Sequence, residues 1–295
     1  MKSPPNFLQK KIKFSLRERL SEFKTALRHK NLKYLTYNSQ IDFEYNEKLL
    51  TNLGYDLEYT KQILSSENLD YFDKELSWHH HIFSSLSKRK EKLKLLEIGT
   101  GIGNFTNFLS KIFKDSEIIT IDLTQNDPNF INLRHSKENL DITNSRKEEL
   151  FFKKEKIISM NTNKQNEFIS KREQNLRNDN IRLYEIDSFN IIDKFEKNSF
   201  DLIWVDGDHL NPQATIDISN SFHLLKQNGI MLCDDILKKE NNSKYSSNET
   251  FFTLNALENK NLVINKFLIK RCWKINAIRK KYISITSKTN NNLIN

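Results

Sequence analysis

Two short acidic segments of this 295-residue sequence carry side chains that could do chemistry. One is the run Asp206, Gly207, Asp208 and His209, and the other is the pair Asp234 and Asp235. Each follows a short apolar run of the kind that forms a buried strand, so the five ionisable side chains are expected to meet at the carboxyl edge of a parallel sheet. Carboxylates gathered so closely repel one another unless a cation joins them, and their oxygen atoms suit Mg²⁺, Mn²⁺ or Ca²⁺.

The pair Asp234 and Asp235 adds a geometric condition to this hypothesis. Successive residues of a strand point to opposite faces, so both carboxylates can serve one site only if the chain turns at this point. A paired Asp can also simply cap the helix that follows.

A glycine-rich segment and two further strand ends indicate a nucleoside-binding sheet. The segment contains Glu97, Gly99, Thr100, Gly101 and Gly103. Its glycines allow a sharp turn between strand and helix and a close approach of a ligand to the backbone. Asn104 stands where a dinucleotide fingerprint has its last glycine, which disfavours a dehydrogenase.

The next two strand ends supply polar groups suited to a nucleoside. Asp122 ends the second predicted strand, where a carboxylate can accept both hydroxyl groups of a ribose. Asp187 and Ser188 end the third, suitably placed for an adenine amino group.

The elements that must hold these segments are expected from residue 93 onward, where strand and helix patterns alternate as in a parallel sheet. Strands are predicted over 93–98, 118–121, 181–186, 200–205 and 230–233, followed by a C-terminal pair over 262–269 and 281–286. Helices are predicted over 105–113, 164–176, 211–226 and 249–258, the third capped by Asn211 and ending before Gly229.

Two regions lie outside this alternation. Residues 1–90 are expected to form a helical N-terminal extension that acts as a lid or an oligomer contact. Residues 125–163 are an insertion, either a cap over the site or a solvated loop. The adjacent residues His79, His80 and His81 point in different directions on a helix, so we expect helix-surface histidines with one turned inward rather than a metal site.

The chain from about Leu93 to Thr286 resembles class I S-adenosylmethionine-dependent methyltransferases, through the glycine loop, Asp122 and Asp187 in the family's order. The resemblance implies a Rossmann-like α/β fold within residues 91–295, in which a mostly parallel seven-stranded sheet ends in an antiparallel C-terminal hairpin. It also implies S-adenosylmethionine as cofactor. The loop residues would hold its methionine and ribose side, Asp122 the ribose, and Asp187 with Ser188 the adenine region.

The two acidic segments resemble those of metal-dependent O-methyltransferases of the catechol and macrolide-sugar types. The resemblance implies Asp206, Asp234 and Asp235 as ligands of a divalent cation, Mg²⁺ first, and His209 as general base. Asp235 stands where the catechol type has an amide. The implied reaction is O-methylation of a small polyhydroxylated molecule such as a diol or sugar, since a metal bound to two neighbouring oxygens lowers a hydroxyl pKa.

Composition limits the other functions. Two cysteines, Cys233 and Cys272, exclude a disulfide framework, and Cys233 is expected in the core. The absence of an apolar signal or membrane span favours a cytoplasmic protein. The net charge of +9 is spread among glutamates and does not indicate a nucleic-acid partner. A metal-free N- or RNA methyltransferase and a non-catalytic cofactor-binding scaffold stay open as alternatives.

Overall fold

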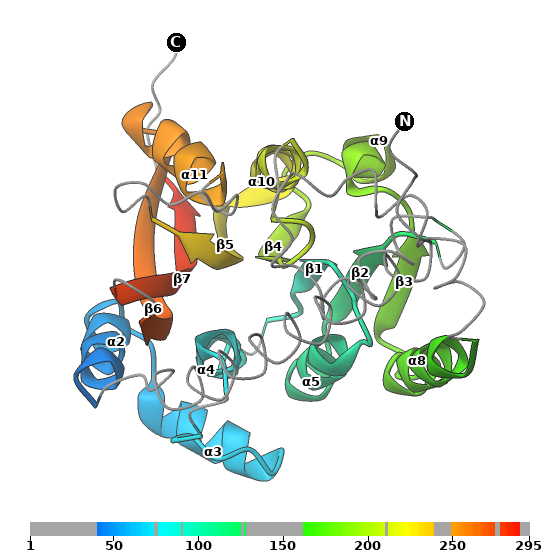
Figure 1. Cartoon of the computed structure of the whole chain (residues 1–295), viewed down its shortest axis with the longest axis horizontal. Helices are drawn as coiled ribbons and strands as arrows, with labels where there is room; N and C mark the ends of the chain where they lie inside the picture. The colour runs from blue at the N-terminus through cyan, green and yellow to red at the C-terminus, as the bar shows by residue number, and fades with distance from the viewer. Residues whose placement is uncertain are drawn as a thin grey trace, which may run out of the picture.

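The computed structural model describes residues 40–73, 76–89, 91–124, 127, 162–209, 212–238, 249–274 and 278–289. Its centre is a seven-stranded sheet in the order β3-β2-β1-β4-β5-β7-β6 (Figure 1). The strands are β1 (Lys94–Ile98), β2 (Glu117–Asp122), β3 (Ile181–Glu185), β4 (Phe200–Val205), β5 (Leu225–Leu237), β6 (Val263–Lys274) and β7 (Ile278–Lys288). The first five run parallel, and β7 is antiparallel to both β5 and β6. The predicted mostly parallel sheet with its antiparallel C-terminal hairpin is confirmed.

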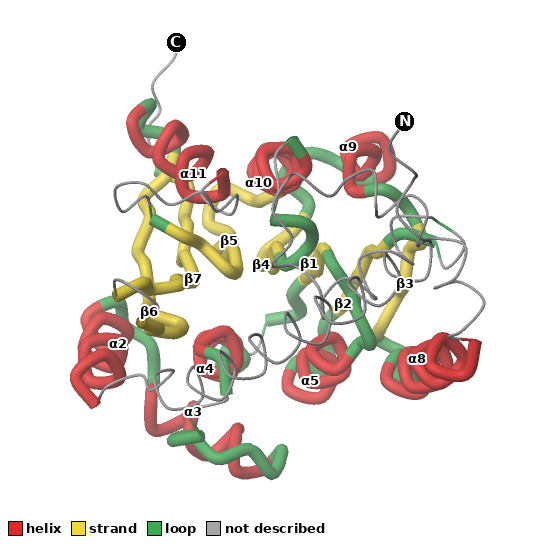
Figure 2. The backbone as a smooth tube through the Cα atoms, in the orientation of Figure 1, coloured by secondary structure: helices red, strands yellow, loops and turns green. Residues whose placement is uncertain are grey.

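Helices cover both faces of the sheet (Figure 2). One face carries α4 (Trp78–Leu86), α5 (Asn104–Ile112) and α8 (Thr162–Asn175), and the other carries α9 (Ile191–Lys194), α10 (Gln213–Leu224) and α11 (Glu249–Asn259). Two further helices, α2 (Gln40–Asn52) and α3 (Leu57–Ser66), lie beyond α4 on the side of β6. The molecule is therefore a three-layer α/β structure.

The alternation of side chains along the strands builds a separate core on each face. Leu95, Leu202 and Trp204 are buried on the α4 side together with Trp78 and Phe83. On the other side, neighbouring strand residues pack with side chains from α10 and α11; this second core contains Leu96, Ile98, Ile203, Val205, Cys233, Ile218 and Leu254. Cys233 is a core residue, as predicted.

The predictions for Gly229 and for the histidines of α4 were wrong. Gly229 does not follow a helix end, because α10 ends at Leu224 and Gly229 lies inside β5. A Cβ at Gly229 would stand 2.9 Å from the carbonyl oxygen of Asp201, so glycine there permits close packing of two strands. His79 and His81 are both buried rather than on the helix surface, because α4 is enclosed by aromatic side chains from several elements.

Several predictions fall partly or wholly outside the described residues. They include Asn211, the first 39 residues of the predicted helical extension and nearly all of the insertion 125–163. The described part of the predicted N-terminal extension forms α2, α3 and α4, and its boundary near residue 90 stays a prediction. Among the described helices, none combines the length and the apolar character needed to cross a membrane.

Candidate functional site

The glycine loop joins β1 to α5 in a conformation that demands glycine. Gly99, Gly101 and Gly103 have φ angles of +98°, +61° and +74°. Side chains with a Cβ rarely adopt this left-handed backbone. A Cβ at Gly99 would also overlap the carbonyl oxygen of Asp206, because β1 and β4 are neighbours in the sheet. The loop expected to hold a cofactor therefore lies directly against the start of the first acidic segment.

Glu97 supports this loop from inside the protein. Its side chain is buried, and its Oε2 accepts hydrogen bonds from the hydroxyl groups of Thr106 and Thr120 at 2.5 and 2.6 Å. Thr120 in turn lies 2.7 Å from the hydroxyl of Thr100. Burial raises the pKa of Glu97 to about 7, although the two threonine hydroxyls favour its ionised form. Glu97 and Thr100 thus belong to one buried hydrogen-bonded network beneath the loop.

Asp122 at the end of β2 reaches the glycine loop. Its Oδ2 accepts a hydrogen bond from the Gly101 backbone N–H at 3.0 Å, and its Oδ1 accepts one from the Leu123 N–H at 2.9 Å. The buried guanidinium of Arg172, on α8, lies 3.7 Å from the same Oδ2. The structure brings the predicted ribose carboxylate to the loop, and it adds a positive charge that the sequence did not indicate.

Asp187 and Ser188 follow β3 and begin a short 3-10 helix, Ser188–Asn190. Asp187 caps this helix by accepting a hydrogen bond from the Phe189 N–H. The Ser188 hydroxyl donates to Oδ1 of Asp217 on α10 at 2.6 Å. Burial raises the pKa of Asp217 to about 6. Asp217, which sequence reasoning missed, links the predicted adenine segment to α10.

The segment after β4 brings His209 back toward the acidic pair. His209 Nε2 lies 3.6 Å from Oδ1 of Asp206 and 3.8 Å from Oδ2 of Asp235. Burial lowers the pKa of His209 below its usual value, against the opposing effect of Asp235 and Asp234. A neutral imidazole beside two carboxylates can accept a proton.

The prediction that the fifth strand ends at Asp234 and Asp235 was wrong, because β5 continues to Leu237 through a β-bulge. The pairing of β5 with β7 shifts between Cys233 and Ile236, and Asp235 has a φ angle of +51°. A bulge re-aims side chains that would otherwise alternate between faces. The turn required for the two carboxylates to share one site is therefore present.

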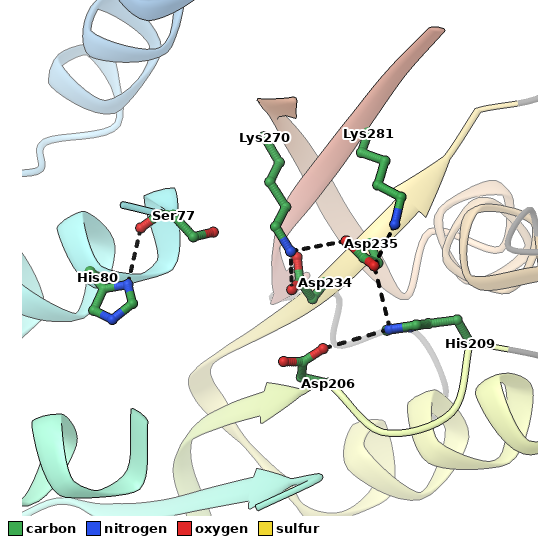
Figure 3. Close-up of polar contacts among 8 residues, drawn as sticks. All are labelled: Ser77, His80, Asp206, His209, Asp234, Asp235, Lys270 and Lys281. Atoms are coloured by element: carbon green, nitrogen blue, oxygen red, sulfur yellow. Dashed lines mark hydrogen bonds and ion pairs between the residues drawn. The ribbon is translucent and has the colours of Figure 1, made fainter. Parts of the chain in front are cut away.

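Two lysines from the C-terminal hairpin contact this acidic pair (Figure 3). Lys270 donates from Nζ to Oδ2 of Asp234 and, at 2.9 Å, to Oδ1 of Asp235. Lys281 donates to Oδ2 of Asp235 at 2.5 Å. Although burial opposes it, the charges of Lys270 and Lys281 lower the pKa of Asp235, and Asp234 and Asp235 raise the pKa of Lys270.

The sequence analysis missed both lysines. The predicted hairpin strands covered 262–269 and 281–286, so Lys270 follows the end of one and Lys281 opens the other. Nothing local shows that these two ends lie beside Asp234 and Asp235. That follows only from the order β5-β7-β6 in the sheet.

The carboxylates do not fit a divalent cation as the protein folds. In the part of the chain that the structure describes, no group of three or more His, Cys, Asp or Glu side chains is arranged to hold a metal ion. The two ammonium groups already contact Asp234 and Asp235, and they would repel an added cation.

Comparison with known proteins gives one family. Residues 96–236 match a family model described as a methyltransferase domain. This segment runs from β1 through the bulge of β5, and so includes the glycine loop and both acidic segments. No curated protein matches the sequence.

Several solved structures are distantly similar to the chain. A putative O-methyltransferase from Klebsiella pneumoniae has 11% identity and a TM-score of 0.48, over 83% of this chain and 96% of that one. The Streptomyces achromogenes O-methyltransferase TomG, in complex with SAM, has 12% identity and a TM-score of 0.46, over 83% and 96%. A Bacillus cereus O-methyltransferase in complex with SAH has 14% identity and a TM-score of 0.45, over 83% and 97%.

Proposed function

We propose that this protein, whose residues 96–236 match a methyltransferase-domain model, is a class I S-adenosylmethionine-dependent methyltransferase that methylates a hydroxyl group of a small molecule carrying more than one hydroxyl. The observation that carries the proposal is the position of His209. Its Nε2 lies within 4 Å of both Asp206 and Asp235, and Asp206 itself adjoins the glycine loop at Gly99. A base and a methyl donor would thus meet at the ends of adjacent strands.

The residues expected to hold the cofactor fit S-adenosylmethionine. The left-handed glycines at 99, 101 and 103 let a ligand approach the backbone, and Asp122 offers a carboxylate for the ribose hydroxyls. Glu97 and Thr100 hold the loop from below, while Asp187 and Ser188 stand at the end of the next strand. When bound, the cofactor supplies a methyl group on a positively charged sulfur.

The work left to the protein is to activate the acceptor. His209 would take the proton from the acceptor hydroxyl, and the bound cofactor would supply the methyl group that the hydroxyl oxygen receives. Asp206 orients the imidazole of His209. Asp234 would accept a hydrogen bond from a second hydroxyl of the acceptor, because its Oδ1 has no hydrogen-bond partner among the described residues.

The sequence favoured a more specific mechanism, in which a divalent cation bound by Asp206, Asp234 and Asp235 assists the transfer. Two lysines bound to the acidic pair oppose it, so the proposal here requires no metal. The metal-free proposal still requires a polyhydroxylated acceptor, because several polar groups converge at this edge of the sheet (Figure 3).

The test measures S-adenosylhomocysteine formation from S-adenosylmethionine with a panel of diols, sugars and phenols. We expect transfer to at least one polyhydroxylated acceptor, and a loss of about 10²- to 10⁴-fold in the rate for His209→Ala. His223→Ala, an exposed histidine on α10, is the matched control and should be unaffected. Full activity of His209→Ala would refute the assigned base, and binding of S-adenosylhomocysteine without transfer to any acceptor would refute the proposed reaction.

A further inference from the structure

We infer that Lys270, rather than a divalent metal ion, is the cation that balances the acidic pair and stabilises the acceptor oxygen during methyl transfer. The inference rests on the proposed function and goes beyond it, because it assigns a residue outside the matched segment 96–236 to the site. Three observations carry it: the burial of Lys270, the two bulges that place it, and an unpartnered oxygen beside it.

Lys270 is nine-tenths buried between the two carboxylates. Its side chain is 10% exposed and that of Asp234 is 4% exposed. Lysine is rarely buried unless it is paired, and burying a charge costs free energy that only good pairing offsets. This lysine therefore occupies the position between carboxylates that a metal ion would otherwise take.

Two β-bulges bring Lys270 to Asp234 across the intervening strand. The β5–β7 pairing shifts just before the Ile236–Tyr282 pair, and the β6–β7 pairing shifts just after the Ile269–Tyr282 pair. Lys270 and the acidic pair thus leave the regular ladder on either side of one β7 residue, Tyr282. Bulges are enriched near active sites because they re-aim side chains.

The charges of this cluster leave no need for a divalent cation. Asp206, Asp234 and Asp235 are opposed by the ammonium groups of Lys270 and Lys281, which leaves one excess negative charge. His79 and His80 of α4 lie near enough for the charge of Lys270 to affect them, and burial lowers the pKa of both. Both histidines are therefore neutral near pH 7 and do not compete with Lys270 for the carboxylates.

The remaining hydrogen-bonding capacity fits an acceptor. An ammonium has three N–H donors, and Asp234 and Asp235 take two of those of Lys270. Oδ1 of Asp234 is buried without a partner among the described residues. A donor on Lys270 and an acceptor on Asp234 can therefore bind two hydroxyl groups of one molecule. The ammonium then stabilises the negative charge that grows on the reacting oxygen as His209 removes its proton.

The decisive experiment measures Mn²⁺ binding to the full chain by calorimetry, without any acceptor. We expect no binding by the wild-type protein with a Kd below about 1 mM. Lys270→Met has a side chain of similar length without charge, and it should bind Mn²⁺ at least tenfold more tightly than wild type, because the cluster gains one negative charge. Lys226→Met is the matched control, since Lys226 on β5 likewise pairs with an aspartate of another strand, Asp201 on β4. This variant should leave Mn²⁺ binding unchanged.

Activity gives the second measurement. Excess EDTA should leave wild-type transfer unchanged, and Lys270→Met should lower kcat by about 10²- to 10³-fold. Lys270→Arg keeps a positive charge and should retain more activity than Lys270→Met. Stoichiometric Mn²⁺ binding by wild type that is lost in Asp234→Asn, inhibition by EDTA, or wild-type kcat in a folded Lys270→Met would each overturn the inference. If wild type methylates no acceptor, the proposed function fails, while the Mn²⁺ titration of the wild-type chain still decides whether a metal binds.

Discussion

Gly99 lies against the backbone of Asp206, so the glycine loop and the first acidic segment are in direct contact. A Cβ at Gly99 would stand 2.7 Å from the carbonyl carbon of Asp206. The Asp206 N–H also donates to the Ile98 carbonyl oxygen at 2.9 Å. The residues proposed for the cofactor and those proposed for the acceptor are thus held in one arrangement by adjacent strands. Backbone contacts, rather than side chains, therefore set the separation between the glycine loop and the first acidic segment.

Gly99→Ala tests this contact. The change combines a φ of +98° with an overlap on the Asp206 carbonyl, so it should cost more than about 3 kcal/mol of unfolding free energy and abolish S-adenosylhomocysteine binding. Gly54→Ala is the control, because Gly54 also has a positive φ of +82° but nothing within 4 Å of its added Cβ. It should cost only about 1 kcal/mol. Equal losses in urea unfolding would show that the overlap with Asp206 is unimportant.

The strands and the glycine loop could be predicted from the sequence because their signals are local. The strand over 200–205 was placed with its observed bounds, since an apolar run stops at Asp206. The loop was recognisable because glycine is rare in this chain and clusters at 99–103. The left-handed φ angles of these glycines explain why no other residue stands there.

The balance of charge at the acidic pair could not be predicted, because it depends on contacts distant in sequence. Lys270 lies on β6, yet it meets Asp234 on β5 across β7, through bulges whose position no local pattern indicates. The burial of His79 has the same origin: its ring packs at a tilt of 37° against Trp204 of β4 and in a T-shaped arrangement with Phe105 on α5. The sequence predicted a divalent cation beside these carboxylates, whereas in the structure the ammonium groups of Lys270 and Lys281 contact them.

Glu97→Gln should remove part of the pH dependence of the unfolding free energy of the cofactor-free protein. The pKa of Glu97 is raised from 4.5 to about 7 by burial, so the folded state binds more protons than the unfolded state between these values. The stability that this proton provides is complete below pH 4.5 and is lost as pH rises through about 7. Wild type should therefore lose about 3 kcal/mol relative to Glu97→Gln over this range.

Urea unfolding at a series of pH values measures this difference. Glu196→Gln, at an exposed position, is the control and should show no such divergence from wild type. Parallel stability curves for wild type and Glu97→Gln would mean that the Glu97 carboxyl is ionised in the folded protein.

His81→Gln should make the stability of the folded protein less sensitive to acid, whereas Glu97→Gln makes it less sensitive to rising pH. Burial lowers the pKa of His81 from 6.5 to about 4, so the unfolded state binds more protons between these values and stability falls as pH drops through this range. Gln can still donate to the Tyr71 carbonyl oxygen, which lies 3.0 Å from His81 Nε2. Acidification from pH 7 to 4 should therefore cost wild type about 3 kcal/mol more than His81→Gln. Thermal melts of both proteins over this pH range make the comparison, with the exposed-site variant His223→Gln as control. Equal acid sensitivity of wild type and His81→Gln would show that His81 is not responsible.

Asp122→Asn should weaken cofactor binding without altering the loop that it contacts. An asparagine oxygen can still accept the Gly101 N–H bond, now made at 3.0 Å, but it lacks the charge that strengthens bonds to ribose hydroxyls and that faces the buried Arg172. Losing such charge-assisted bonds costs about 1.5–3 kcal/mol, so the Kd for S-adenosylhomocysteine should rise about 10- to 100-fold. The exposed α9 variant Asp193→Asn serves as the reference for a lost surface charge. Calorimetric titrations at a temperature where circular dichroism shows both variants folded make the comparison, and an unchanged Kd for Asp122→Asn would remove Asp122 from the cofactor site.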